Sequence, residues 1–313
     1  MTAHPATRSP APRWAEHTVA PDEAGRTVEE IITGPLRISR RMIQKLTRSK
    51  GIRLNRKPAF LARKVKSGDV VGARVTTEEE VGLEPWATEL AILHEDRDIL
   101  LLNKPPFLLV HPLSPEHRET LAHGIAHHYL QQGLRTKVRP VHRLDRDTSG
   151  VLLIAKTAVA HQRLDRQLRE RTMKREYLAL VGGLVTEESG VIDAPIGRDP
   201  RRPHLRRVRA GGGDAARTRY RVVERYDSAT LVRLELETGR THQIRVHMMR
   251  SGHPLLGDRQ YGGRALSPMS RQALHASRLA FLHPDTEEPL SFEAPLPADM
   301  AELRDKLRQP RVP

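Results

Sequence analysis

The chain has 313 residues, and its 53 lysines and arginines against 38 aspartates and glutamates give it a net charge of +15 at pH 7. It contains no cysteine, which excludes disulfide scaffolds, cysteine-ligated metal sites and cysteine nucleophiles. No stretch approaches the roughly 18 apolar residues of a membrane-spanning helix, so we expect a soluble, cytoplasmic protein of about two domains.

The basic excess favours a polyanionic partner, above all nucleic acid, over a surface made basic only for solubility. Residues 1–23 are rich in Pro, Ala and Arg and are predicted to be disordered, whereas residues 24–77 have the signals of a small folded domain. Thr27 with Glu30 predicts a capping box before one short helix, and Ser39 predicts the N-cap of a second helix. This second helix carries four basic residues off its apolar face: Arg40, Arg41, Lys45 and Arg48.

This basic unit resembles a known family through the sequence of residues 38–75, ISRRMIQKLTRSKGIRLNRKPAFLARKVKSGDVVGARV. The segment is similar to the S4 RNA-binding domain, a small α/β domain. The resemblance implies that the Ser-Arg helix and the turn after it lie against RNA. The alternative is a solvated charge run, which we disfavour because the basic residues are interleaved with a periodic apolar set. Residues 78–88, which are acidic and lack periodicity, are predicted to form a linker.

Residues 89–302 are predicted to form one larger α+β domain, followed by a C-terminal tail at 303–313. Short turns between consecutive strands favour a mixed, largely antiparallel central sheet with flanking helices. The predicted strands lie at 99–102, 151–155, 177–181, 219–226, 230–237, 278–282 and 290–293. The predicted helices lie at 121–131 and 158–171.

A first polar segment, residues 142–150, leads directly into an apolar strand. A turn before a buried strand can hold a side chain rigidly while leaving it open to a ligand. The last four residues of the segment fit ordinary turn chemistry. Asp145 does not, because turn formation does not require it, so it is a candidate functional carboxylate.

The side-chain pattern of a second polar segment, residues 238–248, fits both a strand and a helix. Strand alternation would put Arg245 and His247 on one face, whereas Thr241 and Gly252 have the positions of the two end signals of a helix. We favour the helix, in whose first turn Arg245 could add a charge-assisted contact to an anion. Metal binding by the histidines of the segment is disfavoured, because their spacing does not fit one helical face.

Together these segments resemble the RluA family of RNA pseudouridine synthases over residues 89–297. The strongest match is HRLDRDTSGVLLIAKT, which begins at His142. Supporting matches are NKPPFLLVHP, KREYLALVGG and TGRTHQIRVHMMRSGHPLLGDRQYGG. One departure is visible, because Phe107 occupies the glycine position of the family's Lys-Pro-x-Gly pattern, so the backbone after Pro106 is not predicted by the resemblance.

The resemblance implies isomerisation of uridine, in which the N1–C1′ bond breaks and C5 is joined to C1′. Asp145 would supply the carboxylate, either as a nucleophile or by stabilising an oxocarbenium-like or glycal-like species. Arg245 would keep that carboxylate ionised. Tyr177 would cover the base, and its hydroxyl would help to remove the C5 proton. No cofactor and no metal is demanded by this chemistry.

The resemblance also implies contacts to RNA. The target uridine must leave its stack, and Arg143 would fill or brace the gap. His142 and Lys104 belong to the same motifs and are predicted to contact the base or the RNA. We further predict a mobile RNA-gripping loop at 198–213, rather than a disordered insertion, with the basic residues Arg201, Arg202 and Arg206.

The expected partner is therefore RNA, and the expected protein is a monomer. Family members modify large-subunit ribosomal RNA, transfer RNA or both, and we favour ribosomal RNA. A second hypothesis is a non-catalytic RNA-binding or ribosome-associated protein of the same fold. A third is a glycosidase acting on free nucleosides, which the basic N-terminal unit disfavours.

Overall fold

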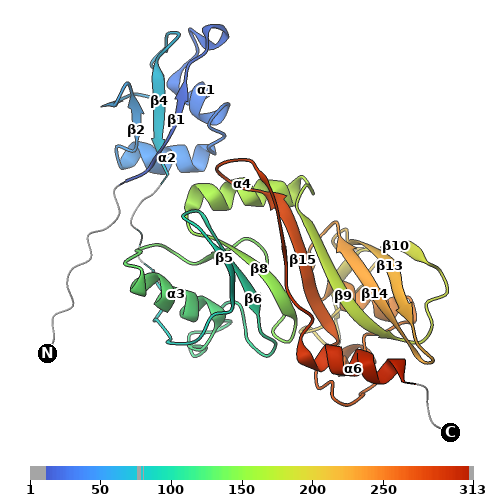
Figure 1. Cartoon of the computed structure of the whole chain (residues 1–313). Coiled ribbons are helices and arrows are strands. Elements are labelled where there is room, and N and C mark those ends of the chain that lie inside the picture. Colours follow the sequence, from blue (N-terminus) through green and yellow to red (C-terminus); the bar gives the residue numbers. More distant parts are fainter. Residues whose placement is uncertain (1–11, 76–78, 80, 310–313) are drawn as a thin grey trace, which may run out of the picture.

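The computed structural model describes residues 12–75, 79 and 81–309. The N-terminal unit, drawn in blue in Figure 1, is a four-stranded antiparallel sheet in the order β1-β4-β2-β3 that packs against two helices. A buried apolar cluster of its own fills this unit, including Ile31, Ile43 and Leu46. Its elements are β1 (Trp14–Thr18), η1 (Pro21–Glu23), α1 (Val28–Thr33), α2 (Arg40–Arg48), β2 (Ile52–Leu54), β3 (Lys57–Pro58) and β4 (Val70–Arg74).

Both helices of this unit begin at the predicted caps. The Thr27 hydroxyl accepts from the Glu30 N–H at 3.3 Å, and the Glu30 carboxylate accepts from the Thr27 N–H at 2.6 Å. The Ser39 hydroxyl accepts from the Met42 N–H at 3.3 Å. These bonds satisfy N–H groups that the first turn of a helix leaves unpaired. Both predicted helices are confirmed.

The N-terminal sheet begins earlier than predicted. Disorder through residue 23 is wrong for Trp14–Thr18, which pairs antiparallel with β4 along its whole length. The guanidinium carbon of Arg53 lies 3.9 Å from the centre of the Trp14 ring. A short strand beside a Pro-rich segment shows little periodicity of its own, and its partner strand is distant in the sequence. Residues 1–11 of the same prediction lie outside the described residues.

The larger unit is built on a ten-stranded sheet in the order β10-β13-β14-β9-β15-β8-β6-β5, with β16 on β15 and β7 on β8. Its pairings are antiparallel except that of β15 with β8, which confirms the predicted α+β class. Every predicted strand is present. The strands are β5 (Ile92–Glu95), β6 (Ile99–Lys104), β7 (Arg139–Pro140), β8 (Ser149–Ala155), β9 (Lys174–Gly182), β10 (Ser189–Asp193), β13 (Arg217–Arg225), β14 (Ala229–Leu236), β15 (Leu274–Leu282) and β16 (Pro289–Glu293).

Helices cover both faces of this sheet (Figure 1). Alternate residues of one strand face opposite clusters: Leu100 and Leu102 pack with α3 (Leu121–Gln131) and α5 (Gln243–Arg250), whereas Ile99 and Leu101 pack with α4 (Ala158–Arg169). This is the two-residue period of a strand that is buried on both sides. Across the described ranges, no helix has the length and apolar character needed to cross a membrane.

The C-terminal tail predicted at 303–313 is wrong up to residue 308. Ala298–Arg308 forms α6, whose Met300 and Leu303 are buried against the sheet. The sequence hides the start of α6, because its N-cap is Pro297 and no side chain caps the first turn. Residues 310–313 of the predicted tail are outside the described part of the chain.

The loop predicted at 198–213 is wrong for residues 206–208, which form a strand, whereas its predicted mobility and RNA contact stay predictions. Two strands of this region, β11 (Ile196–Arg198) and β12 (Arg206–Val208), form a hairpin. Leu205 and Ile196 are buried in a small apolar cluster with Tyr261. The hairpin is therefore anchored by its own apolar residues, although its arginines face outward.

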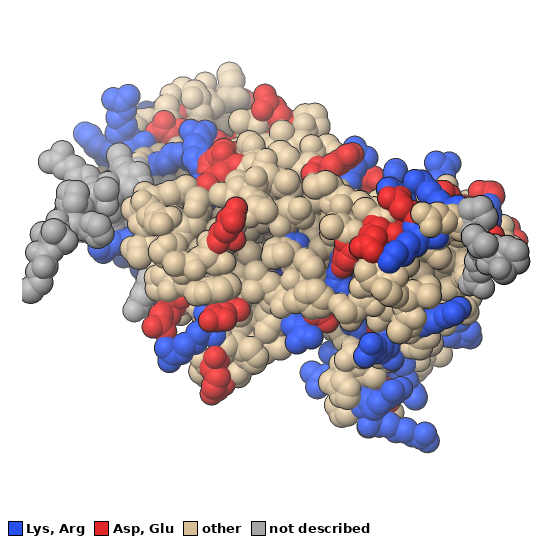
Figure 2. Space-filling model, turned by 60° about the horizontal axis from the view of Figure 1, so that its bottom comes forward, with Lys and Arg blue, Asp and Glu red and all other residues tan. Residues whose placement is uncertain are grey.

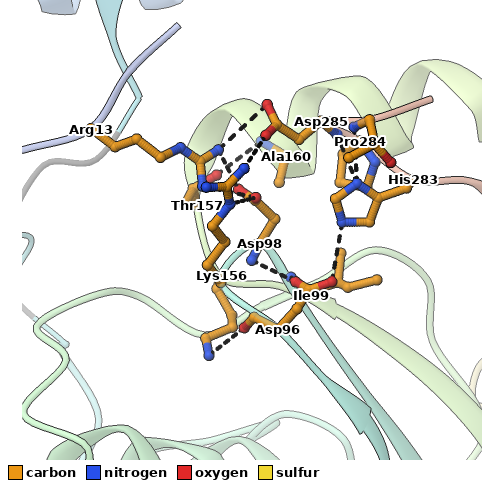
Figure 3. Close-up of polar contacts among 12 residues, drawn as sticks. Arg13, Asp96, Asp98, Ile99, Lys156, Thr157, Ala160, His283, Pro284 and Asp285 are labelled. Atoms are coloured by element: carbon orange, nitrogen blue, oxygen red, sulfur yellow. Dashed lines mark hydrogen bonds and ion pairs between the residues drawn. The ribbon is translucent and has the colours of Figure 1, made fainter. Parts of the chain in front are cut away.

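The two units meet through polar contacts beside α4. The Arg13 guanidinium donates to both oxygens of Asp98 at 2.7 and 2.8 Å and also lies near Asp285 (Figure 3). The Ser39 N–H donates to the Gln162 side-chain oxygen at 2.9 Å, and the Gln162 amide donates back to the Arg37 carbonyl. The predicted boundary between the units stays a prediction, but these contacts show that the N-terminal unit rests against the larger one.

Candidate active site

Asp145 lies in the loop between β7 and β8 (residues 141–148, the Asp145 loop), which two buried basic side chains hold through its backbone. Lys104 Nζ donates to the backbone carbonyl of Arg146 at 2.9 Å. Arg271 Nη1 donates to the carbonyl of the next residue at 3.0 Å. Because both partners are backbone groups, these two bonds do not depend on the Asp145 side chain.

The strand that follows the loop is fixed by a glycine. Gly150 has φ +115°, a backbone conformation that disfavours any other residue. A Cβ atom at Gly150 would lie 2.1 Å from the carbonyl oxygen of Ala276 on β15. The parallel pairing of β8 with β15 therefore requires glycine here, and it determines where the Asp145 loop ends.

The structure brings Arg245 to Asp145, with Arg245 Nη1 3.6 Å from Asp145 Oδ2. Arg245 Nε and Nη2 donate to the two oxygens of Asp258 at 2.7 and 2.8 Å, and Nη2 also donates to Gln260 Oε1 at 2.8 Å. Asp258 is almost completely buried and Arg245 is 5% exposed. A bidentate partner fixes the plane of a guanidinium, so Asp258 holds Nη1 toward Asp145.

Arg245 lies in α5, so the helix predicted for this segment is confirmed and the alternative strand is not present. The predicted N-cap, Thr241, is wrong. The N-cap of α5 is His242, which has φ +58° and makes no side-chain cap bond. His242 Nε2 lies 4.0 Å from Asp145 Oδ2, and its Nδ1 lies 2.7 Å from the Tyr261 hydroxyl. Burial lowers the pKa of His242 more than the Asp145 charge raises it. His242 is thus neutral at pH 7, and Arg245 is the cation beside Asp145.

Asp145 and Arg245 open into a cavity of about 550 Å³. Its walls also include Tyr177 from β9, Leu236 at the end of β14 and Arg143. Burial raises the pKa of Tyr177, so its hydroxyl is protonated at neutral pH. A volume of this size accommodates a nucleoside-sized ligand.

Two predicted RNA-contacting residues have buried polar groups that bond to the protein. Lys104 is fully buried, and its Nζ donates to three backbone carbonyls, those of Pro105, Leu108 and Arg146. Burial lowers the pKa of Lys104 to about 7. His142 lines the cavity, but its Nε2 accepts from the backbone N–H of Leu153 at 3.3 Å, and burial lowers its pKa to about 3. Lys104 does not reach the surface, so its predicted RNA contact is wrong.

The other predicted RNA-contacting residues are on the surface. Arg143, Arg201 and Arg202 are exposed, and Arg206 is partly buried. Lys45 is also exposed and forms an ion pair with Glu79. Figure 2 shows Lys and Arg side chains gathered at the end of the molecule that carries β13 and β14.

The backbone of Phe107 explains why the related family has glycine at this position. It has φ +65°, the left-handed conformation that favours glycine, and its ring is 55% exposed. A non-glycine residue in this region costs on the order of 1 kcal/mol or more. The glycine typical of this position is therefore explained by the turn itself.

We expect Phe107→Gly to raise the free energy of unfolding by about 1 kcal/mol and Tm by about 2 °C, because glycine relieves this backbone strain. Thermal unfolding followed by circular dichroism measures the change. The matched control is Phe60→Gly, which removes an 87% exposed phenylalanine that has no positive φ. If both substitutions lower Tm equally, the strain at Phe107 is refuted.

Three residues that hold other groups of the site in place were not predicted from the sequence: Asp258, Tyr261 and Arg271. Each is buried and acts on another residue of the site, as the bonds to Arg245, His242 and the Asp145 loop show. The first two belong to the motif that ends in GDRQYGG, which was the only sequence signal for them. Arg271 lies outside every motif, so only the folded chain reveals its role.

Comparison with known proteins finds similarity to RNA pseudouridine synthases. A family model described as RNA pseudouridylate synthase matches residues 98–250. The chain is 41% identical to the uncharacterized RNA pseudouridine synthase YhcT of Bacillus subtilis over 93% of this chain and 96% of the relative. It is 40% identical to the ribosomal large subunit pseudouridine synthase D of Nitrosomonas europaea over 94% of this chain and 88% of the relative. The solved structure of human RNA Pseudouridylate Synthase Domain Containing 4 matches with a TM-score of 0.58 at 25% identity, covering 70% of this chain and 93% of that one.

Proposed function

The chain belongs to the RNA pseudouridine synthase family, and on that premise we propose that it converts specific uridines of large-subunit ribosomal RNA to pseudouridine through the Asp145 carboxylate. The observation that carries the proposal is the Asp145–Arg245 pair at the mouth of a nucleoside-sized cavity. The relatives named large-subunit synthase D support the choice of substrate.

The proposed reaction begins with heterolysis of the C1′–N1 bond, whose electron pair leaves with the uracil. The Asp145 carboxylate compensates the positive charge that develops at C1′, by attack or by electrostatic contact. The Arg245 guanidinium offsets the cost of desolvating the carboxylate charge when the bound base excludes water. The freed uracil turns, its C5 forms a bond to C1′, the C5 proton is lost and N1 takes up a proton, so that substrate and product are isomers.

The other cavity residues position the base. The Tyr177 ring forms part of the wall and can stack on uracil, and its raised pKa keeps the hydroxyl a hydrogen-bond donor in the resting enzyme. Arg143 is exposed on the Asp145 loop and can fill the space left by an extruded uridine. The polar backbone of RNA would then contact the basic surfaces on both sides.

We also propose that the N-terminal unit is an S4-like RNA-binding domain whose contact surface is α2. Arg40, Arg41 and Arg48 are exposed on this helix. A groove of about 480 Å³ runs along it, lined by Arg41, Gln44, Lys45, Arg48 and Ser49. A basic helix face of this kind neutralises phosphates without reading sequence.

Replacing Arg40, Arg41 and Arg48 together with Ala is expected to weaken RNA binding about 10- to 100-fold and to reduce the slope of log Kd against log salt by about 2, because up to three phosphate contacts are lost. The rate on saturating RNA is expected to stay the same. Filter binding at several salt concentrations measures Kd and its dependence on salt. The matched control replaces Arg304, Lys306 and Arg308 of α6, and an equal change in slope for both variants would contradict an RNA contact on α2.

A pseudouridine map of ribosomal and transfer RNA from a deletion strain, compared with its parent, tests the proposed substrate. We expect one or more large-subunit positions to lose pseudouridine and to regain it when the wild-type gene is restored. Loss confined to transfer RNA would contradict the ribosomal substrate. An unchanged map would favour the non-catalytic RNA-binding alternative.

A further inference from the structure

Arg175 differs from the other buried arginines of the protein. The described part of the chain buries three arginine side chains, Arg175, Arg245 and Arg271. Arg245 and Arg271 each donate two hydrogen bonds to one aspartate, Asp258 and Asp299 respectively. Arg175 is 8% exposed, and no carboxylate among the described residues forms an ion pair with it. It is a buried cation without a counter-ion from the described chain.

The hydrogen-bonding capacity of Arg175 is also largely unused. A guanidinium has five N–H donors. In the described structure, Nη2 donates to the Leu236 carbonyl at 3.2 Å, while Nε is buried and has no partner. Desolvating a charge without compensation is costly, and unused buried donors add to that cost. A buried charge of this kind in a cleft is therefore a candidate for binding a ligand.

The position of Arg175 identifies where that ligand binds. Arg175 lines the same cavity as Asp145 and Tyr177. The charges of Arg175 and Asp145 both act on the Tyr177 hydroxyl, in opposite directions. Gly239 makes room for the guanidinium, because a Cβ atom there would lie 2.8 Å from Arg175 Nη1. The cavity thus holds an anionic group in Asp145 and a cationic group in Arg175 beside one aromatic ring.

On the basis of the proposed function, we propose that Arg175 is a further catalytic residue that binds a carbonyl oxygen of the target uracil and stabilises the negative charge on the base when the C1′–N1 bond breaks. The electron pair of that bond moves to N1 and is delocalised onto O2 and O4 of the ring. A guanidinium donor held in a desolvated cavity stabilises such a developing oxyanion more than it stabilises the neutral base. Arg175 and Asp145 then serve the two halves of one heterolysis, the base and the sugar.

Single-turnover isomerisation of saturating ribosomal RNA by Arg175→Met tests this assignment. The rate is expected to fall about 100- to 1,000-fold, as after removal of one oxyanion donor, while Kd and its salt dependence stay unchanged. Arg175→Lys keeps the charge and should recover part of the rate. If Arg175 instead bound a backbone phosphate, Kd would rise and the salt slope would fall by about 0.7 to 0.9 with the rate retained, which would overturn the assignment.

The Tm of the variants distinguishes a catalytic role of Arg175 from a structural one. Removing an unpaired buried charge is expected to leave Tm of Arg175→Met unchanged or higher. Gly239→Ala provides a second variant, since its methyl group displaces the guanidinium and should lower the rate without removing the charge. The matched control is Lys174→Met, which removes the neighbouring exposed cation of β9, paired with Glu235, and should leave the rate unchanged.

Two results would overturn the assignment: full activity of Arg175→Met, or a large fall of its Tm together with the loss of rate. The failure of the proposed function is distinguishable, because it would show as an absence of pseudouridine formation by the wild-type protein itself. An active wild type with an unaffected Arg175→Met would reject only the role of Arg175.

Discussion

Asp145→Asn is expected to lower the single-turnover rate of pseudouridine formation by at least about 10⁴-fold, a loss typical of removing a nucleophile. Asparagine preserves the size of the side chain and removes the charge that compensates C1′. Because the Asp145 loop is held by Lys104 and Arg271 through backbone carbonyls, the loop should keep its position in the variant. RNA affinity and Tm should therefore stay close to those of the wild type.

The matched control for this substitution is Asp147→Asn in the same loop. The Asp147 side chain pairs with the exposed Arg146, so its replacement changes the same charge without reaching Arg245. We expect Asp147→Asn to retain the wild-type rate within a few-fold. Equal losses in both variants would indicate a general disturbance of the loop, and a retained rate in Asp145→Asn would refute the carboxylate mechanism.

Asp258→Ala is expected to cause the largest combined loss of stability and activity outside the Asp145 loop. Asp258 accepts two hydrogen bonds from Arg245, and both side chains are buried. Breaking a buried ion pair from one side leaves an uncompensated charge and costs about 3–5 kcal/mol. Chemical denaturation should show this fall in the free energy of unfolding, and the rate should fall because Arg245 is no longer held toward Asp145.

A double variant distinguishes the two effects of Asp258. Asp258→Leu combined with Arg245→Met replaces the pair by apolar groups, which is often neutral for stability. We expect the double variant to recover stability without recovering activity. If Asp258→Ala keeps wild-type activity at a temperature where it is folded, then Asp258 does not position Arg245.

Local signals in the sequence predicted much of the fold. The caps at Thr27 and Ser39 and the apolar run after Gly150 carry their information within a few residues, and the corresponding elements are present. The strand at Trp14–Thr18 and the helix from Ala298 lack such signals, because one depends on pairing with β4 and the other begins without a side-chain cap. Elements that are stabilised mainly by distant partners were the ones missed.

The residues of the site also differ in whether nearby sequence or distant contacts reveal their role. Asp145, Arg245 and Tyr177 stand in recognisable motifs, and the structure places all three at one cavity. The pairing of Asp258 with Arg245 depends on how α5 and the segment after it pack together. The spacing of Arg175 and Tyr177, by contrast, places both on one face of β9. The predicted RNA contact of Lys104 is wrong, because a basic residue in a motif does not reveal its own burial and the buried Lys104 supports the Asp145 loop.

The most direct test of the account is the release of tritium from large-subunit ribosomal RNA that carries [5-³H]uridine. Formation of the C5–C1′ bond expels the C5 hydrogen, so we predict that the wild-type protein releases tritium to water while the RNA retains its uracil. The Asp145→Asn variant should release none above background. Release of free uracil would identify a glycosidase instead, and no release by the wild-type protein on ribosomal RNA would contradict the proposed function.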